Sequence, residues 1–245
     1  MNIEYHLIDK NYTKANNRKI EYIVIHYTAG VSSKVGRARG TATWFNNASA
    51  QASAHYIVDD GLVVQAVADN NIAWHCGAKS YKHAFCRNNN SIGIEICSNH
   101  DHFINYDKTP ASDPGWYFTK EEVNNAAELT ADLMNKYNIP VENVIRHYDV
   151  TGKDCPAIWV DENKEGIKGW HNFLNLVKSK LNNDKEGVTV YKTFNDIPQW
   201  GKEAVQFLVC EGYIVGTGNG ELNIDNSMLR CIVIMYRLLK DKGVI

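Results

Sequence analysis

The stretch from Val144 to Pro156 carries a histidine, a lysine and a cysteine within nine positions. His147 and Cys155 are ligand types that zinc accepts, and the segment between them is long enough for a loop that doubles back. Lys153, two residues before Cys155, is a cation that favours the thiolate, which is the metal-binding form of cysteine. Two ligands do not make a zinc site, so a third must come from elsewhere in the chain.

His26 is the candidate for the third ligand. The run from Tyr22 to Tyr27 is apolar and β-branched, which predicts a buried strand ending at Thr28 to Gly30. His26 then lies at a strand end and faces the following loop, where catalytic groups gather in open α/β sheets. Three protein ligands leave one position for water, as in catalytic zinc sites. A structural zinc needs a fourth protein ligand, for which Cys76 or Cys97 could serve.

Glu95 is the one carboxylate in the apolar run from Ser91 to Cys97, which predicts a second buried strand. A buried, unpaired carboxylate is costly, so Glu95 needs either a basic partner or a function. Desolvation raises the pKa of a carboxyl group towards the range that suits a general base. A salt bridge to an arginine or a lysine is the alternative.

Five short segments, taken in order, resemble one enzyme family. They are Ile25 to Gly30, Ala54 to Val58, Trp74 to Gly77, Ile92 to Ile96, and Arg146 to Pro156. Together they resemble the zinc N-acetylmuramoyl-L-alanine amidases of phage endolysins, which are related to the peptidoglycan recognition proteins. The resemblance covers roughly residues 20–180. Each segment is a weak signal alone, but five in order with matching spacing are strongly specific.

The resemblance implies a peptidoglycan hydrolase, an endolysin or autolysin, that cleaves the amide bond between N-acetylmuramic acid and L-alanine by zinc-activated water. It implies that His26, His147 and Cys155 hold Zn²⁺. Glu95 is expected to take the proton of the water and pass it to the leaving amine, and Lys153 to stabilise the developing oxyanion.

In the family, a Trp-His loop lines the substrate groove, which here implies substrate contacts by Trp74 and His75. An indole and an imidazole offer a flat apolar face and a polar edge, which suit a sugar–peptide substrate. Simple packing of Trp74 is the alternative. Some family members carry a catalytic tyrosine where this chain has Ala54, so that role is not carried over. The neighbouring His55 is either a core histidine bonded to backbone or a catalytic or substrate-binding group.

Two other functions compete with this interpretation. A non-catalytic peptidoglycan recognition module is the first, and such relatives typically lack the cysteine ligand that this chain has at Cys155. A zinc hydrolase of other amides, such as a free muropeptide, is the second.

Composition places the chain among ordinary globular proteins. It has 245 residues, of which 44% are hydrophobic and 22% are charged, and a formal net charge of −2, which gives no electrostatic argument for nucleic acid. No apolar run approaches the ~18 residues of a membrane span. No signal peptide is recognisable, so we expect synthesis in a host cytoplasm, action on the wall after release, and free thiols at all six cysteines.

The elements that must position these residues alternate between strands and helices. Asp59 to Gly61 separates two apolar runs and predicts a hairpin, and Thr119 to Glu122 is a capping box that opens a helix. A loop is expected over residues 30–40, a short helix over 41–47 and a final helix over 167–181. This order predicts an α/β domain over residues 1–181, with a central mixed β-sheet flanked by helices.

Residues 182–189 are polar and predict a linker. Residues 190–245 then resemble one S-layer-homology unit, through Phe194 to Asp196, an amphipathic helix, the turn Gly212 to Gly216 and a second helix. The resemblance implies a small, mostly helical module for wall binding or oligomerisation. A core of this size is marginal alone, so a homo-oligomer formed through this module is plausible.

Overall fold

The computed structural model describes residues 3–30, 37–102, 109–110, 113–160, 162, 165–186 and 189–245, with side chains omitted for 182–186. The chain divides into two compact units, Met1–Leu181 and Asn182–Ile245. Each unit has its own apolar core. Among the described residues, no helix combines the length and the apolar character that crossing a membrane requires. All six cysteines are free thiols, as predicted.

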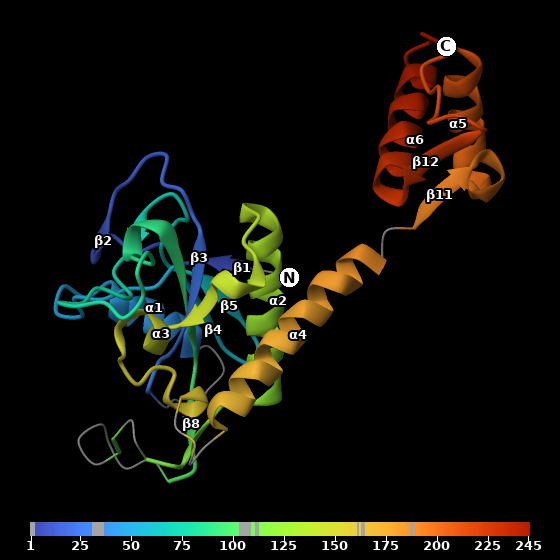
Figure 1. The fold of residues 1–245 in the computed structure, drawn as a ribbon. Helices are drawn as coiled ribbons and strands as arrows, with labels where there is room; N and C mark the ends of the chain where they lie inside the picture. Colours follow the sequence, from blue (N-terminus) through green and yellow to red (C-terminus); the bar gives the residue numbers. More distant parts are fainter. Residues whose placement is uncertain are drawn as a thin grey trace. The chain divides into compact units, whose positions relative to one another are not determined.

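A six-stranded sheet in the order β1-β5-β4-β7-β3-β10 forms the centre of the first unit (Figure 1). Its strands are β1 (Ile3–Tyr5), β3 (Tyr22–Tyr27), β4 (Tyr56–Val58), β5 (Val63–Gln65), β7 (Ser91–Ile96) and β10 (Val144–Arg146). Neighbouring strands are parallel except β4 and β5, which form the antiparallel hairpin predicted around Asp59 to Gly61. The predicted mixed sheet is therefore confirmed.

Helices cover both faces of this sheet. They are α1 (Arg37–Phe45), α2 (Lys120–Tyr137), α3 (His147–Thr151) and α4 (Gly166–Glu186). Apolar side chains of α2 and α4 pack on one face in a single large cluster, while those of α1 pack on the opposite face in a second cluster. Both faces are buried, which explains why the strands read as nearly continuous apolar runs.

Short elements complete the two units. The paired strands are β2 (Tyr12–Thr13) with β6 (Ile72–Ala73), and β8 (Asn99–His100) with β9 (Trp116–Tyr117). Single 3₁₀ turns are η1 (Asn88–Asn90), η2 (Val141–Asn143), η3 (Ala157–Trp159) and η4 (Phe194–Asp196).

The side chains of β3 and β7 point alternately to the two faces of the sheet, and this decides which of them lie together. Ile25 and Ile94 point into the cluster that α2 and α4 cover. Successive residues of a strand point to opposite faces, so His26 and Glu95 face the other side. The two strands are parallel, and their register pairs His26 with Glu95. The two polar residues of these apolar strands therefore lie side by side on one face of the sheet.

Two helix boundaries differ from expectation. α1 begins at Arg37, inside the expected loop, because the side-chain carboxylate of Asp59 accepts a hydrogen bond from the Ala38 amide at 3.0 Å and caps the first turn. Residues 31–36 of that loop lie outside the described residues. α4 continues to Glu186, through residues expected to be linker, because no glycine or proline interrupts the sequence before Gly187.

The start of α2 follows the predicted capping box. The hydroxyl of Thr119 accepts a hydrogen bond from the Glu122 amide, and the Glu122 carboxylate accepts one from the Thr119 amide at 2.7 Å. The same carboxylate also binds Arg37 and Asn99, so the cap ties α2 to α1 and to the end of the sheet.

The second unit contains a two-stranded antiparallel sheet and two helices. They are β11 (Val190–Thr193), α5 (Gln199–Cys210), β12 (Glu221–Asp225) and α6 (Asn226–Asp241). Its core consists of Ile197, Ala204, Val205, Ile224, Leu229 and Val233. Gly212 and Gly216 adopt positive φ angles of 76° and 65°, as the turn between the helices requires.

Candidate active site

Three side chains converge at the carboxyl end of β3. One nitrogen from each of His26 and His147 and the sulfur of Cys155 all lie within 4.8 Å of one another, and all three residues are buried. The Cys155 sulfur lies 3.8 Å from Nδ1 of His26. The residues that the sequence predicts as metal ligands therefore come together from two distant parts of the chain.

The short helix α3 and its following loop bring His147 and Cys155 together. Arg146 donates through its backbone amide and its guanidinium to the Asp149 carboxylate, at 2.8–2.9 Å, which fixes the first turn of α3. Gly152 ends the helix with a φ of 83°, and the Tyr148 amide then donates to the Cys155 carbonyl at 2.9 Å. The sequence predicts that this loop doubles back, but not that His147 begins a helix.

The chemistry of these donors fits a metal ion. Nδ1 of His147 is buried and has no hydrogen-bond partner, which is costly unless something else binds it. Burial, and then the neighbouring His147, holds the pKa of His26 far below its usual value. Burial, and then Lys153, lowers the pKa of His147 to about 3. Both imidazoles are therefore neutral at physiological pH, as a metal ligand requires.

The Cys155 thiol behaves differently from the sequence expectation. Burial, and then the Glu95 carboxylate, raises the pKa of Cys155 well above its usual range, and the opposing effect of Lys153 is smaller. Lys153 favours the thiolate as predicted, but burial outweighs it, because an exposed lysine is largely solvated. A bound metal would therefore have to take the place of the thiol proton of Cys155.

No fourth protein ligand is found within the part of the chain that the structure describes. The group of histidine, cysteine and acidic side chains able to hold a metal contains only the three residues above. Cys76 and Cys97, the candidates for a structural site, are buried in separate apolar clusters. Three ligands with an open position are typical of a catalytic metal rather than a structural one.

Glu95 lies beside this cluster with no basic partner. Its Oε2 atom is buried and has no hydrogen-bond partner, and no ion pair joins it to any other described residue. Burial raises the pKa of Glu95 to about 8, against the lowering effect of Lys153. The salt bridge considered from the sequence is absent from the described residues, and a carboxyl group that titrates near neutral pH can exchange protons readily.

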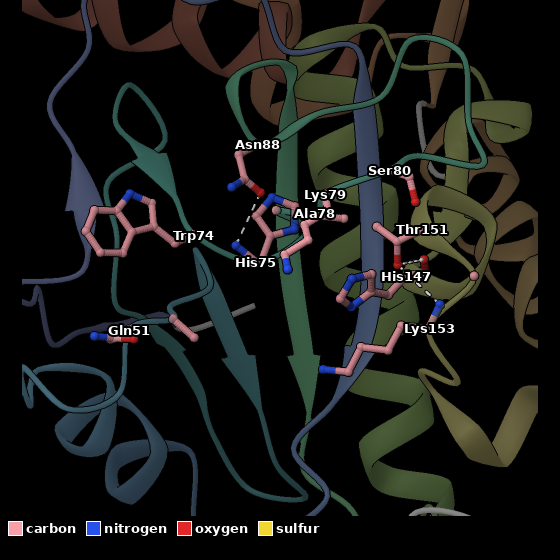
Figure 2. A pocket seen from close by; sticks show the side chains of 13 residues that line it. Gln51, Trp74, His75, Ala78, Lys79, Ser80, Asn88, His147, Thr151 and Lys153 are labelled. Atoms are coloured by element: carbon pink, nitrogen blue, oxygen red, sulfur yellow. Dashed lines mark hydrogen bonds between the residues drawn. The ribbon is translucent and has the colours of Figure 1, made fainter.

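A pocket of about 570 Å³ opens over the site (Figure 2). Trp74 and Gln51 lie at one side of it, and His147 and Lys153 lie at the other. The remaining lining comes from Ala52, His75, Gly77, Ala78, Lys79, Ser80, Asn88, Thr151 and Gly152. Trp74 is 39% exposed, and its indole nitrogen donates to Thr13 at 3.0 Å, so its ring is held at the rim rather than packed in a core.

His75 and His55 are both buried, unlike Trp74. Nδ1 of His75 lies 3.1 Å from Nε2 of His26, and Nε2 of His75 lies 3.1 Å from the hydroxyl of Ser91. His55 accepts a hydrogen bond from the Gly93 amide at 3.0 Å and lies 3.1 Å from a backbone carbonyl through its other nitrogen. His55 is thus a core histidine bonded to backbone, one of the two roles considered from the sequence.

Ser91 belongs to the site although it is not among the residues predicted from the sequence. This serine is fully buried in β7 and contacts His75, which in turn contacts His26. The sequence does contain a signal for Ser91. Ser91, Gly93 and Glu95 alternate with isoleucines, so their side chains point to the same face of the sheet, which is the face on which His26 lies.

Comparison with known proteins gives consistent matches for the first unit. A family model described as N-acetylmuramoyl-L-alanine amidase matches residues 16–158. The N-acetylmuramoyl-L-alanine amidase CwlL of Bacillus licheniformis is 32% identical over 207 residues, which cover 79% of this chain and 51% of CwlL. The chain spans about half the length of the curated relatives it matches, including 42% of BlyA from Bacillus subtilis.

Solved structures show the same architecture. PlyL matches with a TM-score of 0.54 at 27% identity, over 72% of this chain and 97% of its own. The catalytic domain of XlyA also matches with a TM-score of 0.54 at 27% identity, over 72% of this chain and 99% of its own. The predicted α/β class is confirmed by these matches.

Proposed function

The chain belongs to the N-acetylmuramoyl-L-alanine amidase family, and from this we propose that it hydrolyses the amide bond between N-acetylmuramic acid and L-alanine in bacterial peptidoglycan. The observation that carries the proposal is the convergence of His26, His147 and Cys155 beside an unpaired Glu95. Amide hydrolysis needs an activated water, a proton acceptor and a cation near the oxyanion, and this site supplies residues for each need.

Zn²⁺ is the cofactor that this donor set favours, because two neutral imidazoles and one thiolate are ligands that zinc prefers. His26, His147 and Cys155 would hold it. When bound, zinc would supply Lewis acidity to the substrate carbonyl and to water. Of these three residues, His147 also lines the pocket.

Glu95 acts as the general base and then as the general acid. It lies beside His26 in the register of the sheet, and burial raises its pKa to about 8 in the metal-free protein, so its carboxyl group can accept and release a proton near neutral pH. Lys153 lines the pocket next to His147 and is exposed, so its ammonium group can meet the negative charge that develops on the carbonyl oxygen.

The pocket fits a sugar–peptide substrate. Trp74 offers a flat apolar face at the rim, while Gln51, Asn88 and Ser80 offer hydrogen-bonding groups. The two lysines of the lining, Lys79 and Lys153, give it a positive charge that matches the carboxylates of a peptidoglycan stem peptide.

The second unit serves attachment rather than chemistry. It contains no histidine, and its cysteines, Cys210 and Cys231, are exposed single thiols. Large apolar side chains remain exposed on it, among them Trp200 and Met235 at 46% and 63%. We assign this unit, with its resemblance to an S-layer-homology repeat, to wall binding, and self-association is the competing role. The protein then acts on the wall as an endolysin or autolysin.

Digestion of purified cell walls tests the proposed bond. The products are separated and their masses and new termini are determined. Cleavage at the proposed amide creates new amino-terminal L-alanine and intact glycan strands with free lactyl groups. New reducing sugar ends, or termini within the stem peptide, would contradict the assignment. Binding to walls with no cleavage would point instead to a non-catalytic recognition module.

A further inference from the structure

A line of hydrogen bonds runs from the group formed by His26, His147 and Cys155 into the sheet and ends on a backbone carbonyl. It starts at Nε2 of His26, passes through His75 and the hydroxyl of Ser91, and ends at the carbonyl oxygen of Arg87. The three distances are 3.1, 3.1 and 2.6 Å. We call these groups the His75 chain.

The Arg87 carbonyl fixes the direction of every proton in the His75 chain. A carbonyl oxygen only accepts, so the single hydroxyl proton of Ser91 is donated to it. Ser91 must therefore accept from Nε2–H of His75. A neutral imidazole has one N–H and one lone pair, so Nδ1 of His75 is an acceptor. The N–H that it accepts belongs to Nε2 of His26.

This assignment determines which nitrogen of His26 can bind a metal. With its proton on Nε2, His26 carries its lone pair on Nδ1. Nδ1 is the atom that lies 3.8 Å from the sulfur of Cys155, inside the cluster of ligands. The opposite tautomer would place a proton, rather than a lone pair, towards the metal position.

The surroundings hold His75 in place for this purpose. Its ring lies against Gly93 of β7, where a Cβ atom would come within 2.6 Å of the ring, so only glycine leaves room. The side-chain oxygen of Asn88 accepts hydrogen bonds from the amides of His75 and Cys76, at 3.3 and 2.8 Å. The rings of His26 and His75 meet edge to face, with centroids 5.2 Å apart.

We propose that His75 and Ser91 are positioning residues for the metal centre, which set the Nε2–H tautomer and the ring orientation of His26. This role differs from the substrate contact expected for His75 from the sequence. Partners of this kind raise the metal affinity of a ligating histidine, and losing one typically lowers it about 10- to 100-fold. The proposal rests on the zinc site proposed above.

Zinc affinity, measured by competition with a chromophoric chelator, provides the first test. Ser91→Ala and His75→Phe should each weaken zinc binding by about 10- to 100-fold. Thr130→Val is the matched control, since Thr130 is equally buried and also donates to a backbone carbonyl, at 2.7 Å, but lies on α2, away from the loop that holds His75. Its zinc affinity should equal that of the parent. The proposal would be overturned if the parent, the two variants and the control all bound zinc equally well. It would also be overturned if the control lost as much zinc affinity as Ser91→Ala and His75→Phe.

Imidazole nitrogen NMR of the metal-free protein provides a second test, which a merely structural role would not affect. In the parent, both His26 and His75 should be Nε2–H tautomers, and Ser91→Ala should lose this preference at His75. A parent spectrum with His26 as the Nδ1–H tautomer overturns the proposal, even if His75→Phe fails to fold. A parent that binds no zinc would refute the metal site. The NMR spectrum would still show whether the protons of the His75 chain lie where we assign them.

Discussion

At the scale of the residue, Glu95 is the group whose environment differs most from that of an ordinary carboxylate. It is paired in register with a proposed ligand, has one buried oxygen without a partner, and has a pKa of about 8. Glu95→Gln keeps the shape of the side chain and removes its ability to move a proton. We predict that this variant retains its fold and its zinc while its turnover on muropeptides falls by ~10²- to 10⁴-fold.

The measurement is a steady-state rate together with the zinc content of the same sample. The parent with matched zinc content is the control, so that a lost metal is not mistaken for a lost base. A rate close to that of the parent would show that a group other than Glu95 transfers the proton.

The same carboxyl group makes the stability of the metal-free protein depend on pH. The folded protein holds the Glu95 proton up to about pH 8, whereas an unfolded chain releases it near pH ~4.3. Between these values the folded state binds more protons, so the contribution of Glu95 to the free energy of unfolding falls as pH rises. The slope cannot exceed about 1.4 kcal/mol per pH unit.

Glu95→Gln removes this titration. In denaturant unfolding at pH 5, 6, 7 and 8, the variant should gain stability relative to the metal-free parent at each step upward. Glu121→Gln, a change at an exposed carboxylate on α2, is the control. A difference between Glu95→Gln and the parent that stays constant over this range would show that Glu95 is not buried as a neutral acid.

At the scale of the element, parallel strands do most of the positioning. β3 carries His26 and β7 carries Glu95, and their register places the two side by side. β10 pairs with the edge of β3 opposite to β7, and α3 follows it directly in the chain, with His147 as its first residue. The apolar runs were enough to predict these strands, but not the register that sets His26 beside Glu95 on one face of the sheet.

Other features of the elements depend on partners that are distant in sequence. The first turn of α1 is capped by Asp59, and the carboxylate of Glu122 binds Arg37. A local pattern contains no information about such contacts, so the start of α1 was placed too late. The link from His26 to Ser91 was missed for the same reason, since it needs the loop that holds His75 to fold back on β7.

At the scale of the whole molecule, the family match over residues 16–158 falls within the first unit, whereas the role of the second stays a proposal. Two binding sites joined in one chain raise the effective concentration of the wall polymer at the catalytic site. A chain ending at Glu186, which retains α4, should therefore cleave soluble muropeptides at the parent rate. It should bind and lyse intact walls more weakly than the full chain.

Wall pull-down and light scattering, run on both chains, separate the two roles of the second unit. Unchanged wall binding by the shortened chain, together with a loss of self-association, would refute wall targeting and leave oligomerisation.

The central claim is that His26, His147 and Cys155 hold one zinc ion on which hydrolysis depends. The most direct measurement is a titration of metal-free protein with zinc, in which bound metal and turnover of a muropeptide are followed in the same samples. Turnover should rise linearly to a plateau at one zinc per chain, and Cys155→Ser should bind zinc far more weakly. Full turnover by the metal-free protein would contradict this claim.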